Sequence, residues 1–219
     1  MKILIIGGTG FIGRALVQAL EGEELHLFSR TNNNSAIPVT IGTREELVLN
    51  RAAFVADPPD VVIDTGAQNQ RTAELVLNTF EGQSPHFVVL SSISVYRRYG
   101  WFLGTEPGGT VETHPLDETA PLRTKLFVYR GADGQSTDPS RPWLAEYDKI
   151  LAEQSYTSFP NARVTILRLP LTYGAHDPDS RVQSLVKQMR RTPIVLQNDV
   201  KAWRNARGYV KHVAQAIAC

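Results

Sequence analysis

The chain has 219 residues, of which 42% are hydrophobic, so its length and composition suit one large globular domain. The formal net charge of +1 gives no overall reason to expect a nucleic acid or a membrane surface as partner. A single cysteine, Cys219, excludes an internal disulfide, and no apolar run approaches the ~18 residues of a membrane span. We therefore expect a soluble, cytoplasmic protein.

Apolar, β-rich runs alternate with helical patterns along the chain, which predicts βαβ units and a parallel sheet. Several runs, such as ILII and FVVL, are continuously apolar, as is typical of strands covered on both faces. The predicted strands are 2–6, 24–28, 39–41, 61–64, 86–90, 164–168 and, more weakly, 194–196. The predicted helices are 11–20, 44–54, 71–80, 142–155 and 179–190. Between them, residues 97–140 form a long loop of the kind that compact domains usually keep for function.

A glycine-rich turn, GGTGFIG, joins the first predicted strand to the first predicted helix. Gly7 permits the tight turn, Gly10 lets the backbone approach a pyrophosphate, and Gly13 lets helix and strand pack closely. A glycine triplet is weak evidence by itself, but its place at the head of a βαβ unit indicates a dinucleotide site. We therefore expect an α/β fold, a Rossmann-type doubly wound parallel sheet with helices on both faces. The expected cofactor contacts of this turn are Gly7, Thr9, Gly10, Phe11, Ile12 and Gly13.

The residues at the end of the second predicted strand, in HLFSRT, distinguish binders of NAD from binders of NADP. An NAD binder usually places an acidic residue there to hold the ribose hydroxyls. This chain has Ser29 and Arg30 instead, and an arginine can pair with a 2′-phosphate through a bidentate contact. The pattern therefore predicts NADP(H), with NAD(H) as the open alternative.

Further motifs follow in a recognisable order: LSSISVY at 90–96, YDKILAE at 147–153, LRLPLTYG at 167–174 and RGYVKHVAQAI at 207–217. Together with the glycine turn they resemble the extended short-chain dehydrogenase/reductase family, the NAD(P)-dependent epimerases and dehydratases. The resemblance spans nearly the whole chain. It implies cofactor contacts from Gly66, Ala67, Ser91, Lys149, Pro170 and Tyr173, in addition to Ser29 and Arg30. Members of that family continue for many more residues. We therefore expect residues 1–219 to form a single NAD(P)-binding domain, with 175–219 leading into a truncated substrate-binding part.

In that family a Ser or Thr, a Tyr and a Lys perform the chemistry, and the Tyr lies four residues before the Lys on one helix face. Ser92 matches the Ser and Lys149 matches the Lys, but the position of the Tyr is occupied by Ala145. Tyr147 is only two residues before Lys149, which on a regular helix points it about 200° away around the axis. Tyr147 is therefore either a packing residue or, after an irregular first turn, the catalytic phenol. Tyr129 is a second candidate.

Two functions are consistent with these residues. The first is an NADP(H)-dependent oxidoreductase or epimerase/dehydratase-like enzyme with Ser92, Tyr147 and Lys149 as catalytic residues. Its substrate would be a small carbonyl or alcohol, or a nucleotide sugar. The basic stretch 181–219, with eight Lys or Arg and one acid, would suit an anionic substrate, although such runs are commonly solvated. The second is a non-catalytic NADP(H)-binding sensor or scaffold, which Ala145 favours.

Other partners are expected to be few. RNA is a weaker option that rests on the C-terminal charge alone, so we expect no nucleic acid. The five histidines show no metal-ligand spacing, so we expect no metal. The resemblance implies a homodimer formed through the helices at 71–80 and 142–155.

Overall fold

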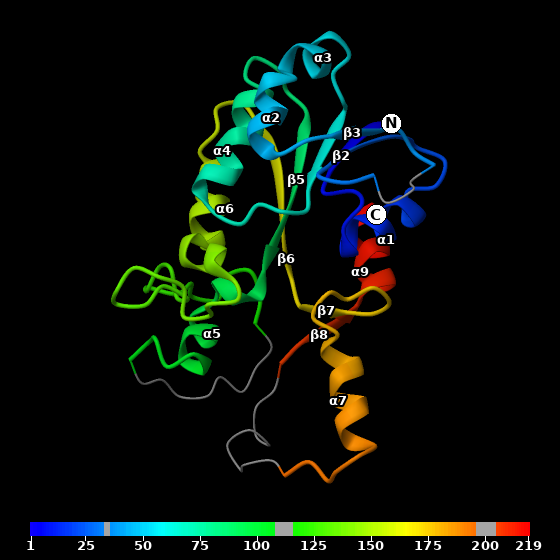
Figure 1. The fold of residues 1–219 in the computed structure, drawn as a ribbon. Coiled ribbons are helices and arrows are strands. Elements are labelled where there is room, and N and C mark those ends of the chain that lie inside the picture. Colours follow the sequence, from blue (N-terminus) through cyan, green and yellow to red (C-terminus); the bar gives the residue numbers. More distant parts are fainter. Residues whose placement is uncertain (33–35, 108–115, 196–204) are drawn as a thin grey trace.

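The computed structural model describes residues 1–32, 36–107, 116–195 and 205–219 (Figure 1). Its centre is a six-stranded, fully parallel sheet in the order β3-β2-β1-β4-β5-β6. The strands are β1 Lys2–Ile6, β2 Glu24–Ser29, β3 Val39–Ile41, β4 Val61–Asp64, β5 His86–Ser92 and β6 Arg163–Leu169. The order reverses between β1 and β4, and in open parallel sheets ligands bind beyond the carboxyl ends of the strands at such a point.

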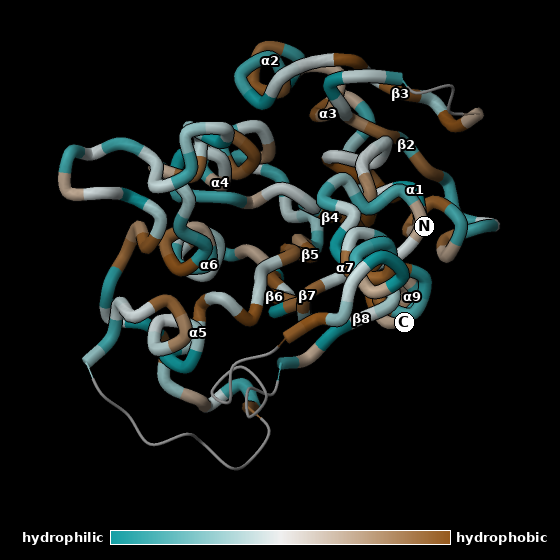
Figure 2. Tube along the Cα trace, turned by 60° about the horizontal axis from the view of Figure 1, so that its bottom comes forward, coloured by the Kyte–Doolittle hydropathy of each residue, from teal (hydrophilic) through white to brown (hydrophobic). Residues whose placement is uncertain are grey.

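Helices cover both faces of the sheet, which confirms the predicted doubly wound α/β fold (Figure 1). One face packs against α2, α3, α4 and α6, with bounds Arg44–Leu49, Arg51–Ala56, Gln70–Thr79 and Lys149–Thr157. The other face packs against α1 Phe11–Ala19 and α9 Val210–Ala218. In Figure 2 the helices α4 and α6 alternate between hydrophilic and hydrophobic residues, as expected of helices with one buried side.

The predicted helix at 44–54 is two helices, α2 and α3, which meet at Asn50. The Asn50 side chain donates a 2.8 Å hydrogen bond to the carbonyl oxygen of Glu46, which also accepts the Asn50 backbone N–H at 3.0 Å, so Asn50 caps the end of α2. The start of α2 is well defined, because Thr43 and Glu46 form a reciprocal capping box.

The predicted helix at 142–155 is also wrong. Residues Pro142–Glu146 form a short 3₁₀ turn, η2, and α6 begins only at Lys149. Asp148 caps α6: its backbone is extended, and its carboxylate accepts a 3.0 Å hydrogen bond from the Ile150 N–H. Aspartate is among the preferred N-cap residues, so its presence just before Lys149 was the signal for this break.

Beyond the sheet, the chain adds smaller elements. The loop region after β5 contains the 3₁₀ turn η1 Ile93–Val95 and the helix α5 Arg97–Phe102. A two-stranded sheet pairs β7 Leu171–Tyr173 with β8 Arg207–Tyr209, and α7 spans Arg181–Met189. Of the weak strand expected at 194–196, residues 194 and 195 lie in no strand, and Leu196 is outside the described residues. None of the described helices is long and apolar enough to cross a membrane.

Candidate functional site

The glycine turn after β1 has the conformation that its three glycines predict. Gly7 has φ +85°, which favours glycine, and Gly10 is the exposed N-cap of α1. A Cβ added to Gly13 would lie 2.3 Å from the Gly7 carbonyl oxygen, so only glycine lets α1 approach the turn. A Cβ added to Gly10 would meet only that same oxygen, at 3.1 Å. Gly10 therefore presents an open backbone surface at a helix start, where anions bind.

Thr9 connects this turn to the end of β2. Its hydroxyl lies 2.5 Å from the Ser29 hydroxyl and donates a 3.0 Å hydrogen bond to the Thr31 carbonyl oxygen. Arg30, between these two residues, is exposed. From the other side, Arg14 Nε donates a 2.9 Å hydrogen bond to the Thr9 carbonyl oxygen. Arg14 is thus held beside the glycine turn, and Arg30 directly follows the adjacent end of β2.

Arg14 was missed by the sequence analysis. The signal was its place directly after Gly13, in the first turns of α1, where a basic side chain stands beside the phosphate-binding N–H groups. Phe11 and Ile12, in contrast, pack partly against the core on the α1 side of the sheet.

The loop that follows β4 faces the glycine turn across the switch point. The Thr65 hydroxyl donates a 2.8 Å hydrogen bond to the Ile6 carbonyl oxygen and so joins the loop to the end of β1. Gly66 is half-buried and Ala67 is buried. The loop is also bonded to α6, because the Asp148 N–H donates to the Gln68 carbonyl oxygen at 3.0 Å.

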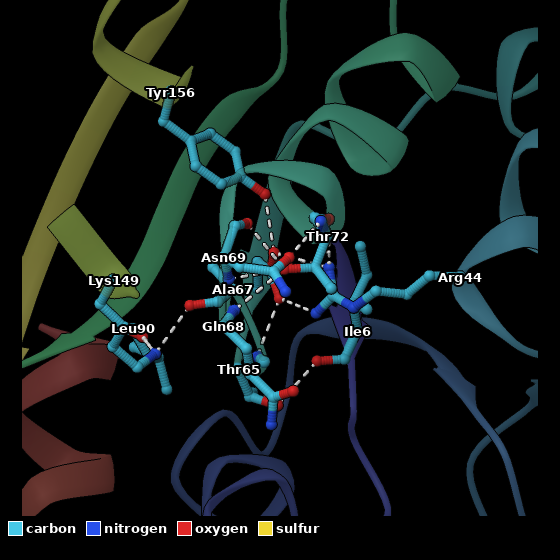
Figure 3. A network of polar contacts seen from close by, with 12 residues as sticks. Ile6, Arg44, Thr65, Ala67, Gln68, Asn69, Thr72, Leu90, Lys149 and Tyr156 are labelled. Carbon is cyan, nitrogen blue, oxygen red and sulfur yellow. Dashed lines mark hydrogen bonds and ion pairs between the residues drawn. The ribbon is translucent and has the colours of Figure 1, made fainter. Parts of the chain in front are cut away.

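A buried polar network is centred on Asp64, directly before this loop in the sequence, and Figure 3 shows Arg44 and Tyr156 of this network. The Arg44 guanidinium makes a bidentate ion pair with the Asp64 carboxylate, with Nη1 2.9 Å from Oδ2. The Tyr156 hydroxyl donates to the same carboxylate at 2.7 Å, and the Gly66 N–H donates at 2.9 Å. Burial alone would raise the pKa of Asp64, but Arg44 and these donors hold it below its ordinary value. The network joins α2, β4 and α6 under the cofactor crevice, and the sequence analysis did not find it.

Lys149 is the first residue of α6 and its ammonium lies under the same loop (Figure 3). Nζ donates to the Ala67 carbonyl oxygen at 2.9 Å and to the Leu90 carbonyl oxygen at 2.6 Å. Burial lowers the pKa of Lys149 to about 8, and nearby Asp64 limits this decrease. Since an ammonium has three donors, one N–H remains after these two bonds.

This burial leads to a prediction about pH. The unfolded chain holds the Lys149 proton up to its ordinary pKa of 10.5, whereas the folded chain releases it near pH 8. Between these values the unfolded state binds more protons, so the free energy of unfolding should rise with pH. We expect this residue to add about 2 kcal/mol between about pH 8 and pH 10. Urea titrations of Lys149→Met should lack that rise.

Lys187→Met is the matched control, because Lys187 is exposed on α7. If Lys149→Met shows the same pH dependence as the unchanged protein, Lys149 is solvated and fully charged in the folded state.

The two serines at the end of β5 have different surroundings. The Ser91 hydroxyl donates to Glu153 Oε1 at 2.5 Å, and Glu153 forms an ion pair with Arg168 at 2.9 Å. The Ser92 hydroxyl accepts a 3.1 Å hydrogen bond from the Ser94 N–H and caps η1. Ser92 is partly exposed at the carboxyl edge of the sheet, two residues beyond the carbonyl oxygen that Lys149 contacts.

Tyr147 precedes α6, so the argument from a regular helix does not apply to it. Its ring packs between Tyr129 and Trp143, with ring centroids 5.8 Å and 6.0 Å away. Burial raises the pKa of Tyr147 to about 12, while the adjacent Ser94 hydroxyl acts in the opposite direction. The ammonium of Lys149, in contrast, donates to the carbonyl oxygens of Ala67 and Leu90.

The other candidates are placed as follows. Ala145 is buried in η2 and not on α6, so a tyrosine there would not share a helix face with Lys149. The Tyr129 hydroxyl lies 2.9 Å from the Tyr99 hydroxyl, and burial raises the pKa of Tyr129. Pro170 directly precedes β7 and Tyr173 is its last residue, with the Tyr173 ring centroid 5.9 Å from that of Tyr209. Within the described ranges, no group of three or more metal-binding side chains is found.

The comparisons with known proteins show the family of this chain. The family model of the NAD-dependent epimerase/dehydratase family matches residues 3–124, which is more than half of the chain. The chain belongs to this family. A search of curated proteins finds no match.

Solved structures of epimerases and dehydratases share the fold at low sequence identity. MoeE5 in complex with UDP-glucose and NAD is 19% identical with a TM-score of 0.66, and the match covers 99% of this chain and 70% of that one. UDP-glucose 4-epimerase of Thermotoga maritima, with UDP-glucose, is 16% identical with a TM-score of 0.65, and the match covers 99% of this chain and 72% of that one. The dTDP-glucose 4,6-dehydratase of Bacillus anthracis, with NAD, is 17% identical with a TM-score of 0.63, and the match covers 99% of this chain and 70% of that one.

Proposed function

We propose that this family member binds NADP(H) at the carboxyl edge of the sheet and transfers hydride to or from a carbonyl or alcohol carbon. The observation that carries the proposal is the glycine turn, with Arg14 bonded to it and Arg30 directly after the adjacent end of β2. Gly10 leaves the backbone open, and the Thr9 hydroxyl contacts Ser29 and Thr31, the two sequence neighbours of Arg30, close to the position where an adenosine 2′-phosphate would lie. NAD is bound in two of the structures named above. NAD binders usually place an acidic residue at the end of the second strand to hold the ribose hydroxyls, where this chain has Ser29 and Arg30.

The catalytic residues are assigned by their places around this edge. Ser92 would hold the substrate oxygen, and the remaining N–H of Lys149 would reach a hydroxyl of the nicotinamide ribose. Bound NADPH supplies a hydride. UDP-glucose is bound by two similar structures, and it makes nucleotide sugars the first substrates to test, together with simple aldehydes and ketones. The homodimer and the cytoplasmic location stay predictions.

The assignment of NADP(H) as cofactor predicts a higher affinity for NADPH than for NADH. NADPH should bind at least about tenfold more tightly than NADH, which corresponds to about 1.4 kcal/mol. Arg30→Ala should remove most of this difference, and Arg14→Ala part of it, because each removes a charge-assisted contact to the 2′-phosphate. Calorimetric titration with NADPH and with NADH measures the difference in affinity for each variant. The control is Arg71→Ala, since Arg71 is exposed and pairs with Glu45 on the other side of the fold. Equal affinities for NADPH and NADH in the unchanged protein would contradict the assignment.

A second function, NADP(H) binding without catalysis, is favoured by Ala145, which stands four residues before Lys149, and by the bonds of the Lys149 ammonium to the Ala67 and Leu90 carbonyl oxygens. NADPH oxidation in the presence of a panel of aldehydes, ketones, UDP-glucose and dTDP-glucose separates the two. Oxidation above the rate without substrate supports an enzyme. Tight NADPH binding without turnover of any compound supports a sensor or scaffold.

A further inference from the structure

A row of aromatic side chains runs from α5 to the residues just before α6. Tyr99 of α5 lies next to Phe102, with ring centroids 6.0 Å apart, and its hydroxyl lies 2.9 Å from that of Tyr129. The Tyr129 ring lies 5.8 Å from the Tyr147 ring, which in turn lies 6.0 Å from the Trp143 ring. These side chains come from three separate parts of the sequence, so the tertiary structure assembles the row.

The row lies around the turn that begins at Ser92. Ser92 caps η1, and both α5 and α6 contact this turn. The first rings of the row are on α5, and the last two, Tyr147 and Trp143, directly precede α6, whose first residue is Lys149. The aromatic row therefore joins the two elements that flank the candidate catalytic residues, beyond the carboxyl end of β5 (Figure 1).

The row is open to solvent at Trp143. Tryptophan is highly buried on average, but Trp143 is 48% exposed, and Tyr147 beside it is partly exposed. A ligand can therefore reach this end of the row. Aromatic rings attract one another in edge-to-face and offset arrangements beyond the gain from burying their area, so a further ring placed against Trp143 and Tyr147 would be bound favourably.

The polar groups of the surrounding loop are largely engaged with one another. Three arginines between α5 and α6 each form an ion pair: Arg123 with Asp148, Arg130 with Glu146, and Arg141 with Asp138. A nucleotide sugar carries a diphosphate, which needs cationic partners, whereas a planar hydrocarbon ring needs an aromatic surface. The loop therefore suits an aromatic ring better than a diphosphate. Arg97 of α5 has a buried Nε atom without a hydrogen-bond partner, so UDP-glucose is the competing ligand to test.

We propose that the substrate of this protein is a carbonyl compound that carries an aromatic ring, and that this ring binds against Trp143 and Tyr147 as an extension of the row. This inference rests on the proposed function and deepens it by naming the substrate class. In the reduction, the carbonyl carbon receives the hydride of NADPH and the carbonyl oxygen takes up a proton supplied by water. The products are NADP+ and the alcohol with the same ring.

The test compares phenylacetaldehyde with cyclohexylacetaldehyde. The two have the same carbon skeleton and an unconjugated carbonyl group, so they differ in the aromaticity of the ring. With NADPH, kcat/KM should be about fivefold higher for phenylacetaldehyde, the gain expected of one aromatic pair. A second readout needs no turnover: in ligand-observed NMR titrations of the NADPH-loaded protein, Kd should be about fivefold lower for 2-phenylethanol than for 2-cyclohexylethanol.

Three variants locate the preference. Trp143→Leu, which keeps apolar bulk but removes the ring, should bring both ratios to within about twofold of unity. Trp143→Phe, which keeps a ring, should retain at least about a threefold preference. Trp101→Leu is the matched control, because Trp101 is outside the row and its indole N–H donates to the Pro107 carbonyl oxygen at 3.1 Å. It should leave both ratios unchanged, and all three variants should bind NADPH with Kd within about twofold.

Several results would overturn the inference. These are equal affinities for the two alcohols in the unchanged protein, an unchanged preference in Trp143→Leu, or a loss in Trp143→Phe as complete as in Trp143→Leu. Tighter binding of UDP-glucose than of 2-phenylethanol would assign the site to a nucleotide sugar instead. A dimer that Trp143→Leu dissociates in sedimentation would assign the exposed ring to a second copy of the chain. Each of these results with normal NADPH binding overturns this inference alone, whereas failure to bind either cofactor would overturn the proposed function itself.

Discussion

Replacing Gly10 with valine should abolish NADP(H) binding while the protein stays folded. The exposed backbone of Gly10 caps α1, and its φ of −76° is accessible to any residue, so the fold does not require glycine there. A dinucleotide does require it, because its pyrophosphate would occupy the space next to this backbone. We expect Kd for NADPH to rise by at least about 100-fold, or about 2.7 kcal/mol, in calorimetric titration. Circular dichroism should show a Tm within a few degrees of the unchanged protein.

Gly13→Ala, unlike Gly10→Val, should also destabilise the fold. Its added Cβ would lie 2.3 Å from the Gly7 carbonyl oxygen and 2.6 Å from that of Gly8, so α1 would have to move away from the turn. We expect this variant to lose both stability and binding. If folded Gly10→Val protein retained its affinity for NADPH, the dinucleotide would have to bind elsewhere on the molecule.

Replacing Asp64 with alanine should destabilise the protein by about 3–5 kcal/mol, a large part of the 5–15 kcal/mol typical of a domain. The Asp64 side chain is fully buried, and its loss leaves the Arg44 guanidinium, 16% exposed, without its counter-ion. The Tyr156 hydroxyl and the Gly66 N–H lose their acceptor as well. Urea unfolding followed by tryptophan fluorescence measures the change in the free energy of unfolding.

Two further variants separate the ion pair from the rest of the network. Tyr156→Phe removes one hydrogen bond to a charged group and should cost about 2 kcal/mol. The double variant Arg44→Met, Asp64→Leu removes both charges and should be more stable than Asp64→Ala, because no unpaired charge stays buried. If the double variant were less stable than Asp64→Ala, the cost would come from lost packing rather than from the unpaired guanidinium.

The parallel sheet and the glycine turn could be predicted from the sequence because their signals are local. Continuous apolar runs such as ILII and FVVL report strands buried on both faces, and the structure confirms them as β1 and the core of β5. The roles of Gly7 and Gly13 follow from backbone conformation and close approach, which a few neighbouring residues determine. Helix ends were predicted less well: Asn50 and Asp148 each end or start a helix by a side-chain hydrogen bond that periodicity does not reveal.

The α/β fold, the six strands of the parallel sheet and the place of the glycine turn could be predicted from the amino-acid sequence. The surroundings of each catalytic candidate depend on the tertiary structure. Lys149 is buried because carbonyl oxygens of two different segments, at Ala67 and Leu90, converge on it. Arg123 and Asp148 form a fully buried ion pair although 25 residues separate them in the sequence. Hydrogen bonds, ion pairs and burial of this kind depend on distances between residues remote in sequence, and no pattern of neighbouring residues encodes them.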